Sequence, residues 1–198
     1  MAAILTSLNR TVTAGVILAV ILFLIYLGTQ GYSGSAFGPF FFRWLHVLSG
    51  VMWIGLLWYF NFVQIPSMPK IPDEQKPAIG KVIAPEALFW FRWGAMATIV
   101  TGLILAWMNG YLADAILIGL KDGVPKHTAI GIGMWLGAIM WANVWFVIWP
   151  KQKIALGIVE ASAEEKPKAA RTAMLFSRTN TLLSIPMLFA MVSAQNIY

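Results

Sequence analysis

The 198-residue chain has no cysteine, and this absence excludes several kinds of site. Without thiols the chain can form no disulfide and no thiolate metal site. It also cannot attach a c-type haem through a Cys-x-x-Cys-His motif. A haem in this protein would therefore be of b type, held by side-chain nitrogen or sulfur ligands.

Charged residues are also scarce. They make up 11% of the chain, against about 25% in soluble domains, while 59% of the residues are hydrophobic. Apolar runs of about 20 residues are typical of membrane helices, because a helix satisfies its own backbone polar groups inside the bilayer. The composition therefore predicts an all-α integral membrane protein. The net charge of +6 is interpreted as a topology signal and not as a nucleic-acid surface.

Five apolar segments are candidate spans, and together they are expected to form one transmembrane domain over residues 1–198. The first lacks an Ala-x-Ala cleavage site and is interpreted as a retained helix. A sixth apolar segment, 111–120, is too short to cross about 30 Å and is expected to be an interfacial or capping helix. The predicted spans are approximately 12–27, 41–64, 88–108, 128–149 and 175–193.

The basic residues predict the orientation of these spans. Placing the N-terminus, the 65–92 connection and the 150–178 connection on one side collects 11 of the 14 Lys and Arg residues there. By the positive-inside rule this side is cytoplasmic and Tyr198 is periplasmic. The 150–178 connection is charged and Ala-rich, so it is expected to be a solvated helix hairpin or linker. The residues collected are Arg10, Lys70, Lys76, Lys81, Arg92, Lys151, Lys153, Lys166, Lys168, Arg171 and Arg178.

The only two histidines, His46 and His127, begin similar patterns in the second and fourth spans. HVLSGVMWIGLLWYFN and HTAIGIGMWLGAIMWAN both contain His, three residues, Gly, a Met-Trp-x-Gly group, five residues and Asn. The second copy has one extra residue before Met. Proline-containing segments follow both copies, which favours a parallel internal repeat. Both histidines are then expected in the outer leaflet at similar depth.

An ionisable side chain within a bilayer is by default a functional residue. Two parallel helices that each offer an imidazole at equal depth could hold one haem iron from both faces. Gly50 and Gly131, four residues after each histidine, would leave room for the macrocycle, and Trp53 would line the pocket. The alternative for the glycines is close helix packing. The sequence thus predicts haem b in a four-helix bundle.

Cations near the histidines are candidates for the haem propionates. Arg43 lies one turn before His46, and Lys126 adjoins His127; both would also suit lipid headgroups. Glu86 and Arg92 flank the start of the third span and are expected to be structural, paired with each other or with Arg178.

Other polar residues carry weaker signals. Asn61 and Asn143, near the inner ends of the two repeat helices, are expected to form interhelical hydrogen bonds. Ten methionines and two histidines would allow copper binding, but no Met-x-x-Met cluster lies in a loop. No motif for a hydrolase is present, and no catalytic residue is assigned.

Three segments resemble the membrane domain of the PuuD family, also called the urate-oxidase N-terminal-type domain. They are RWLHVLSGVMWIGLLWYFNFVQIPSMPKI, MWLGAIMWANVWFVIWPKQK and SRTNTLLSIPMLFAMVSAQ, and the resemblance runs from about residue 41 to the end. It implies a bacterial inner-membrane protein connected with urate oxidation. Full-length family members carry a C-terminal cytochrome c domain, which this sequence lacks. The resemblance extends loosely to HemJ-type protoporphyrinogen oxidases and CopD-like copper proteins.

Three functions remain open at this point. The first is a b-type haem protein that passes electrons to an external cytochrome c, with oxidation of a urate-type molecule as a candidate source of the electrons. The second is a non-catalytic accessory subunit of a larger respiratory complex. The third is transport of copper or another solute. A bis-histidine iron has no open coordination position, which favours electron transfer over oxygen chemistry.

Overall fold

The structure is a computed structural model that describes residues 2–31 and 33–198, and all regular elements in these ranges are helical. Five of the helical segments are long and apolar enough to cross a membrane, so the chain is a multi-pass membrane protein by helix length and hydropathy. These segments are Leu8–Thr29, Gly34–Lys70, Lys76–Met108, Pro125–Ala155 and Glu165–Asn196.

The chain divides into two compact units, residues 1–40 and 41–198. The first contains α1 (Ala2–Leu5), α2 (Leu8–Gln30) and the start of α3 (Gly34–Trp58). The helical elements that follow α3, in chain order, are η1 (Tyr59–Gln64), α4 (Ile65–Ser67), η2 (Met68–Lys70), α5 (Lys76–Ala78), η3 (Ile79–Ile83), α6 (Ala84–Met108), α7 (Leu112–Ile116), α8 (Pro125–Ala142), η4 (Asn143–Ile148), α9 (Trp149–Ala155) and α10 (Glu165–Asn196).

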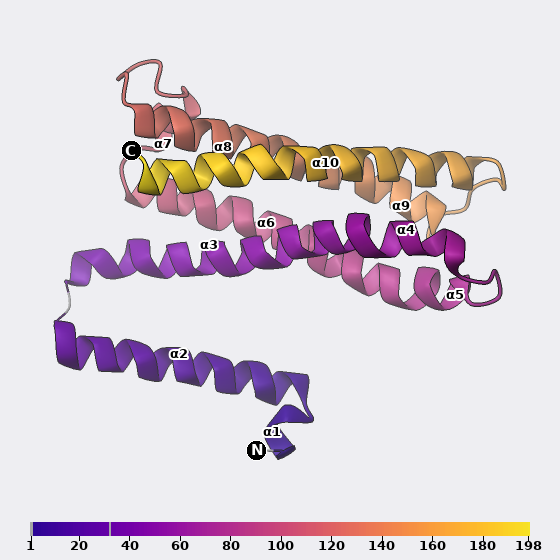
Figure 1. The fold of residues 1–198 in the computed structure, drawn as a ribbon, viewed down its shortest axis with the longest axis horizontal. Coiled ribbons are helices and arrows are strands. Elements are labelled where there is room, and N and C mark those ends of the chain that lie inside the picture. The colour runs from indigo at the N-terminus through magenta and orange to yellow at the C-terminus, as the bar shows by residue number, and fades with distance from the viewer. Residues whose placement is uncertain (1, 32) are drawn as a thin grey trace. The chain divides into compact units, whose positions relative to one another are not determined.

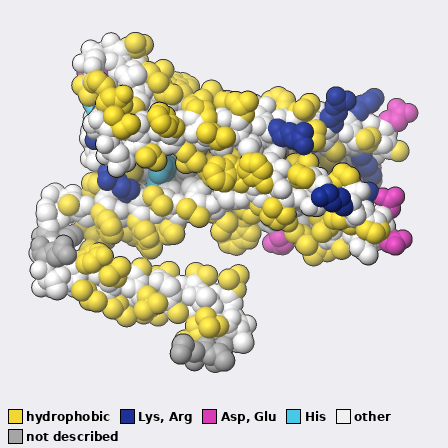
Figure 2. All heavy atoms as spheres, in the orientation of Figure 1, with side chains coloured by type: hydrophobic (Ala, Val, Ile, Leu, Met, Phe, Trp, Pro, Cys, Tyr) yellow, Lys and Arg dark blue, Asp and Glu magenta, His cyan; other side chains and the backbone are white. Residues whose placement is uncertain are grey.

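Within the second unit the long helices run side by side (Figure 1). The helix of α3 and the helix of α8 run in one direction, and α6 and α10 run in the other (Figure 1). Their shared core contains Trp53, Leu57, Phe91, Met140 and Val144, all nearly inaccessible to solvent. Figure 2 shows hydrophobic side chains along the visible length of these helices and charged side chains gathered at the end that holds α5 and α9. This distribution matches a bundle whose middle faces lipid.

The three π-helical elements have a common sequence cause. Each ends two residues before a proline, at Pro66, Pro85 and Pro150. Proline has no N–H, and its ring collides with the carbonyl four residues back, so the backbone widens just before it. In each case the residue before the proline donates its N–H to the carbonyl five residues back. Two of these elements, η1 and η4, occupy the same place in the two histidine-containing segments.

The helices extend beyond the apolar spans predicted from the sequence. One such extension is at α10, which begins at Glu165 although its first turns are polar. Ser162 and Glu165 stabilise this start by a reciprocal pair of hydrogen bonds: Ser162 N–H to the Glu165 carboxylate, 2.8 Å, and Glu165 N–H to Ser162 Oγ, 3.2 Å. Hydropathy detects the part of a helix that lies in lipid, whereas capping decides where the helix begins.

The predicted short helix at 111–120 is α7, which ends at Ile116. The chain then turns through Ile118, Gly119 and Gly123, all with positive φ. A β-branched residue such as Ile118 rarely adopts this conformation, so the turn is held by its surroundings. Gly119 fits because a Cβ there would lie 2.5 Å from Thr128 Oγ1. The loop thereby returns the chain to the start of α8.

Candidate functional site

His46 lies on α3 with its imidazole against α6. Its Nδ1 is 2.9 Å from the carbonyl oxygen of Thr98, and Thr101 Oγ1 is 3.4 Å from the same nitrogen. A carbonyl only accepts hydrogen bonds, so Nδ1 carries the proton and Nε2 is left with its lone pair. A backbone carbonyl that fixes the tautomer in this way is the usual outer partner of a metal-ligating histidine.

The ring of His46 approaches α6 closely because residue 102 is glycine. A Cβ at Gly102 would lie 2.8 Å from Cε1 and 3.0 Å from Nδ1 of His46. A Cβ at Gly50, the glycine singled out from the sequence, would lie 4.0 Å from Thr98 Cγ2 and would fit. Sequence reasoning missed Gly102 because it belongs to another span and no local pattern connects it with the histidine.

Trp53 is buried, with 1% of its surface exposed, in the core between α3 and α6. A Cβ at Gly94 would lie 3.3 Å from the backbone nitrogen of Trp53, so the two helices are closely packed there. Within the described part of the chain, the buried Nε1 of Trp53 has no hydrogen-bond partner. Trp53 therefore lines the protein interior two turns along α3 from His46.

His127 lies in the first turn of α8 and faces the preceding loop. Its Nδ1 pairs with the carboxylate of Asp122, and its ring stacks on Tyr111 with centroids 5.9 Å apart. The hydrogen bond from His127 lowers the pKa of the Asp122 carboxyl, and the N–H of Val124, 3.1 Å from Asp122 Oδ1, lowers it further. As at His46, Nδ1 is engaged and Nε2 is the nitrogen left to bind another group.

Asp114 completes a small cluster around His127. One ligand atom from each of Asp114, Asp122 and His127 lies within 4.8 Å of the others, so the three can hold a metal ion. Two carboxylates and one imidazole suit a divalent cation of intermediate hardness. Sequence reasoning missed both aspartates. The turn between α7 and α8 brings them close to His127, and their spacing in the sequence matches no metal-binding motif.

Tyr111 links Arg43 to this cluster. Burial raises the pKa of the Tyr111 hydroxyl, and the positive charge of Arg43 acts in the opposite direction. Arg43 therefore lies near the ring on which His127 stacks, although its own side chain is exposed. Lys126, also predicted to contact a propionate, is partly exposed beside His127.

Gly131 packs against α7. A Cβ at this position would overlap the carbonyl oxygen of Ala115 and lie 3.1 Å from the Cα of Ile118. The space beside Gly131 is thus filled by the chain itself, which is the close helix packing that the sequence left as an alternative.

The structure therefore gathers the predicted residues into two groups. His46 contacts Thr98, Thr101 and Gly102, whereas His127 contacts Tyr111 and Asp122. Among the described residues no hydrogen bond or ring contact joins the two imidazoles. Arg43, three residues from His46, carries a positive charge that acts on Tyr111 of the second group.

A comparison with known families finds a match for the C-terminal part of the chain, which contains His127. Residues 124–197 match the family described as urate oxidase N-terminal. This confirms the resemblance recognised in the sequence over residues 124–197. The urate oxidase N-terminal match covers the helices from α8 to α10, so it includes His127 and not His46. No curated protein and no solved structure matches the chain.

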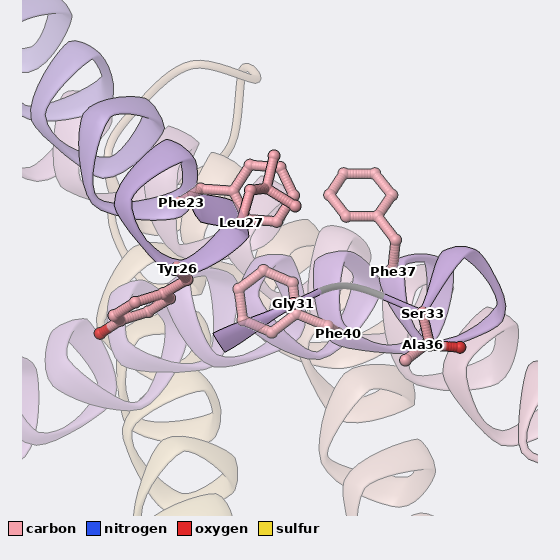
Figure 3. A pocket seen from close by; sticks show the side chains of 8 residues that line it. All are labelled: Phe23, Tyr26, Leu27, Gly31, Ser33, Ala36, Phe37 and Phe40. Carbon is pink, nitrogen blue, oxygen red and sulfur yellow. The ribbon is translucent and has the colours of Figure 1, made fainter. Parts of the chain in front are cut away.

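A pocket within the first unit has a different character. Figure 3 shows its aromatic side chains around the turn between α2 and α3, with Phe23 and Phe40 stacked at 6.3 Å. Two hydroxyl-bearing residues, Tyr26 and Ser33, are the polar members of its lining. The pocket contains no acid, base or metal ligand. It is lined by Phe23, Tyr26, Leu27, Gly31, Ser33, Ala36, Phe37 and Phe40.

Proposed function

We propose that this protein binds haem b in the membrane and transfers electrons to an external cytochrome c. The observation that carries the proposal is the hydrogen bond between His46 Nδ1 and the Thr98 carbonyl, which leaves Nε2 available inside a membrane span. His46 is the proposed first axial ligand. The proposal also includes the four-helix bundle as an internal duplication, supported by η1 and η4, which both end two residues before a proline in the histidine-containing segments.

The donor set fits haem iron when each ligand is considered alone. A carbonyl orients the imidazole of His46, and a carboxylate orients that of His127, so both rings offer Nε2. Bound haem would supply one-electron transfer. His127 would be the second residue to hold the haem. Because the two rings contact different neighbours, its role needs a test separate from that of His46.

The surrounding residues have supporting roles in this proposal. Arg43 and Lys126 would bind the propionate carboxylates by charge-assisted hydrogen bonds. Trp53, which is buried, would exclude water from the haem. Gly50 has no side chain and would leave space beside α3 near His46. Gly131, which is covered by Ala115, would act through packing of α7 and not through contact with the macrocycle.

The family match supports a small-molecule electron donor. The matched family is named for urate oxidase, so a urate-type molecule is the proposed source of electrons. The chain would then act as an oxidoreductase in the bacterial inner membrane, with its histidines and C-terminus on the periplasmic side. The basic residues of the α5 and α9 end support this orientation.

Absorption spectra of the detergent-purified protein, oxidised and dithionite-reduced, test the haem assignment. We expect the sharp reduced bands of a low-spin b haem. His46→Ala should lose most of the haem, and His127→Ala should lose the low-spin signature, because each removes one axial nitrogen. Val47→Ala, an exposed neighbour on α3, is the matched control and should keep the wild-type spectrum. Unchanged haem in both histidine variants would rule the proposal out.

Metal binding without haem is the second candidate, favoured by the Asp114, Asp122 and His127 cluster. Elemental analysis of the same samples separates the two. A stoichiometric divalent metal that disappears in both His127→Ala and Asp114→Asn, with haem unaffected, would assign His127 to the cluster and leave His46 alone on the iron. A protein with neither haem nor metal would favour the accessory-subunit function.

A further inference from the structure

Two cations from different helices share one indole in the second unit. The guanidinium carbon of Arg92, on α6, lies 3.2 Å from the ring centroid of Trp149, and the ammonium nitrogen of Lys153 lies 5.7 Å from the same centroid. Both positions are within cation–π range. Lys153 follows Trp149 by one turn of α9, so this indole lies near two positive charges.

No carboxylate of the described chain compensates these charges. The ion pairs among the described residues are Lys76–Asp73 and His127–Asp122, and neither involves Arg92 or Lys153. The predicted pairing of Glu86 with Arg92 is therefore wrong: Glu86 is exposed, and the guanidinium stacks on Trp149 instead. A partly buried arginine at the end of a membrane span, without an ion-pair partner, is costly, so a bound anion would stabilise it.

The hydrogen bonds around Arg92 also lack acceptors. Nη1 of Arg92 is buried and has no partner in the described structure, and the same holds for Nε1 of Trp145, four residues before Trp149. Arg92 as a whole is only partly buried, so the rest of its guanidinium reaches the surface. These donors have no acceptor in the described structure. A phosphate or carboxylate group would supply acceptor oxygens for a guanidinium.

The location of Arg92, Trp149 and Lys153 in the bundle indicates which kind of anion would bind there. Trp149 and Lys153 belong to α9, at the end of the bundle where charged side chains gather (Figures 1 and 2) and which the sequence predicts to be cytoplasmic. Trp93, the residue after Arg92, is 50% exposed and packs edge-on against Trp145 with centroids 5.5 Å apart, and Phe146, three residues before Trp149, is 70% exposed. A cationic group beside an apolar surface at the membrane boundary matches a headgroup with its acyl chains, not a free ion.

We propose that Arg92 and Lys153, supported by Trp149, bind the phosphate of an anionic phospholipid at the α6–α9 surface. The phosphate offsets the two positive charges and accepts hydrogen bonds from the accessible part of the guanidinium. The acyl chains cover Trp93 and Phe146. The site does not depend on haem, because none of its residues belongs to the histidine groups.

Thermal unfolding of the full chain in detergent tests this proposal. The probes are phosphatidylglycerol, phosphatidylcholine and inorganic phosphate, added separately to the wild type, Arg92→Gln, Lys153→Gln and Arg171→Gln. Arg171 is exposed on α10 and is the matched loss of one positive charge. We expect phosphatidylglycerol to raise the wild-type Tm by roughly 5 °C more than phosphatidylcholine does. Arg92→Gln and Lys153→Gln should lose at least half of that difference, and Arg171→Gln should keep it.

The other outcomes overturn the proposal. An equal loss in all three variants would show a general effect of surface charge. Full retention in Arg92→Gln and Lys153→Gln would place the lipid elsewhere. A shift with inorganic phosphate that matches the lipid shift would show a free-anion site. Arg92→Lys keeps the charge and should keep part of the response, so it replaces Arg92→Gln if that variant does not fold.

Discussion

The orientation of the His46 imidazole depends on the carbonyl of Thr98 and on the glycine at position 102. Thr98 accepts its Nδ1–H, and the bare backbone of Gly102 allows the ring to lie flat enough against α6 to make that bond. The histidine itself was visible in the sequence as a rare titratable residue in an apolar span. Its partners were not, because they follow it by more than 50 residues and depend on which face of α6 meets α3.

Gly102→Ala should displace the His46 imidazole. The added methyl would lie 2.8 Å from Cε1, so either the ring moves and its bond to Thr98 is lost, or the helices separate. Overpacking of this kind costs about 1–3 kcal/mol. We expect a lower Tm and a reduced haem content per protein, measured by unfolding and by absorption.

Gly55→Ala, on α3, is the matched control for that substitution. Its methyl would meet no atom within 4 Å, and alanine favours the helix by about 1 kcal/mol over glycine. The Tm and the haem content should therefore stay unchanged or rise. Equal losses in the two variants would show that the approach of Gly102 to His46 is not what orients the ring.

At the scale of helices, α10 is held by polar residues of the two histidine-containing segments. Asn61 Nδ2 donates to Ser177 Oγ at 2.8 Å, and Asn143 Nδ2 donates to Asn180 Oδ1 at 2.8 Å. The predicted role of Asn61 and Asn143 as interhelical hydrogen-bond residues is confirmed. Asn180 is fully buried and also donates to the carbonyl of Met140 at 2.9 Å. These bonds set the register of α10 against its neighbours.

Asn180→Ala should destabilise the bundle, because Asn143 loses its acceptor and the Met140 carbonyl loses a donor. A buried group left unpaired costs about 1–3 kcal/mol, and interhelical bonds in membranes average nearer 0.6 kcal/mol. We expect Tm to fall by a few degrees in unfolding experiments in detergent.

Thr179→Ala controls for the loss of a polar side chain on α10. Thr179 is exposed, and its hydroxyl bonds only to the Leu175 carbonyl of its own helix, so Tm should change little. If Asn180→Ala melts at the same temperature as Thr179→Ala, the bonds to α8 do not hold α10 in place.

At the scale of the whole molecule, the basic residues predict the side of the membrane on which each connection lies. The absence of cysteine makes this orientation directly testable. Ala163→Cys lies in the connection between α9 and α10, and Lys121→Cys lies in the loop between α7 and α8; both positions are exposed. A membrane-impermeant maleimide should label Lys121→Cys in intact cells, because the positive-inside rule places that loop outside.

Ala163→Cys should react with the same reagent only after the membrane is opened. The cysteine-free wild type should remain unlabelled under both conditions, which controls for background reaction. The reverse pattern, with residue 163 labelled in intact cells, would invert the topology. It would then place the histidine groups on the cytoplasmic side and exclude an external cytochrome c as the direct electron acceptor.

The helical membrane architecture was predictable from the chain because its causes are local. Apolar runs predict the long helices, and prolines after Gln64, Ile83 and Ile148 account for the π-helical elements. The surroundings of the functional residues depended on tertiary structure. Gly102 beside His46 and Trp149 beside Arg92 are contacts between helices distant in sequence, and the turn after α7 brings Asp114 near His127. Such contacts depend on which helix faces meet, and packing of the assembled bundle decides this, because hydropathy is nearly uniform around these helices.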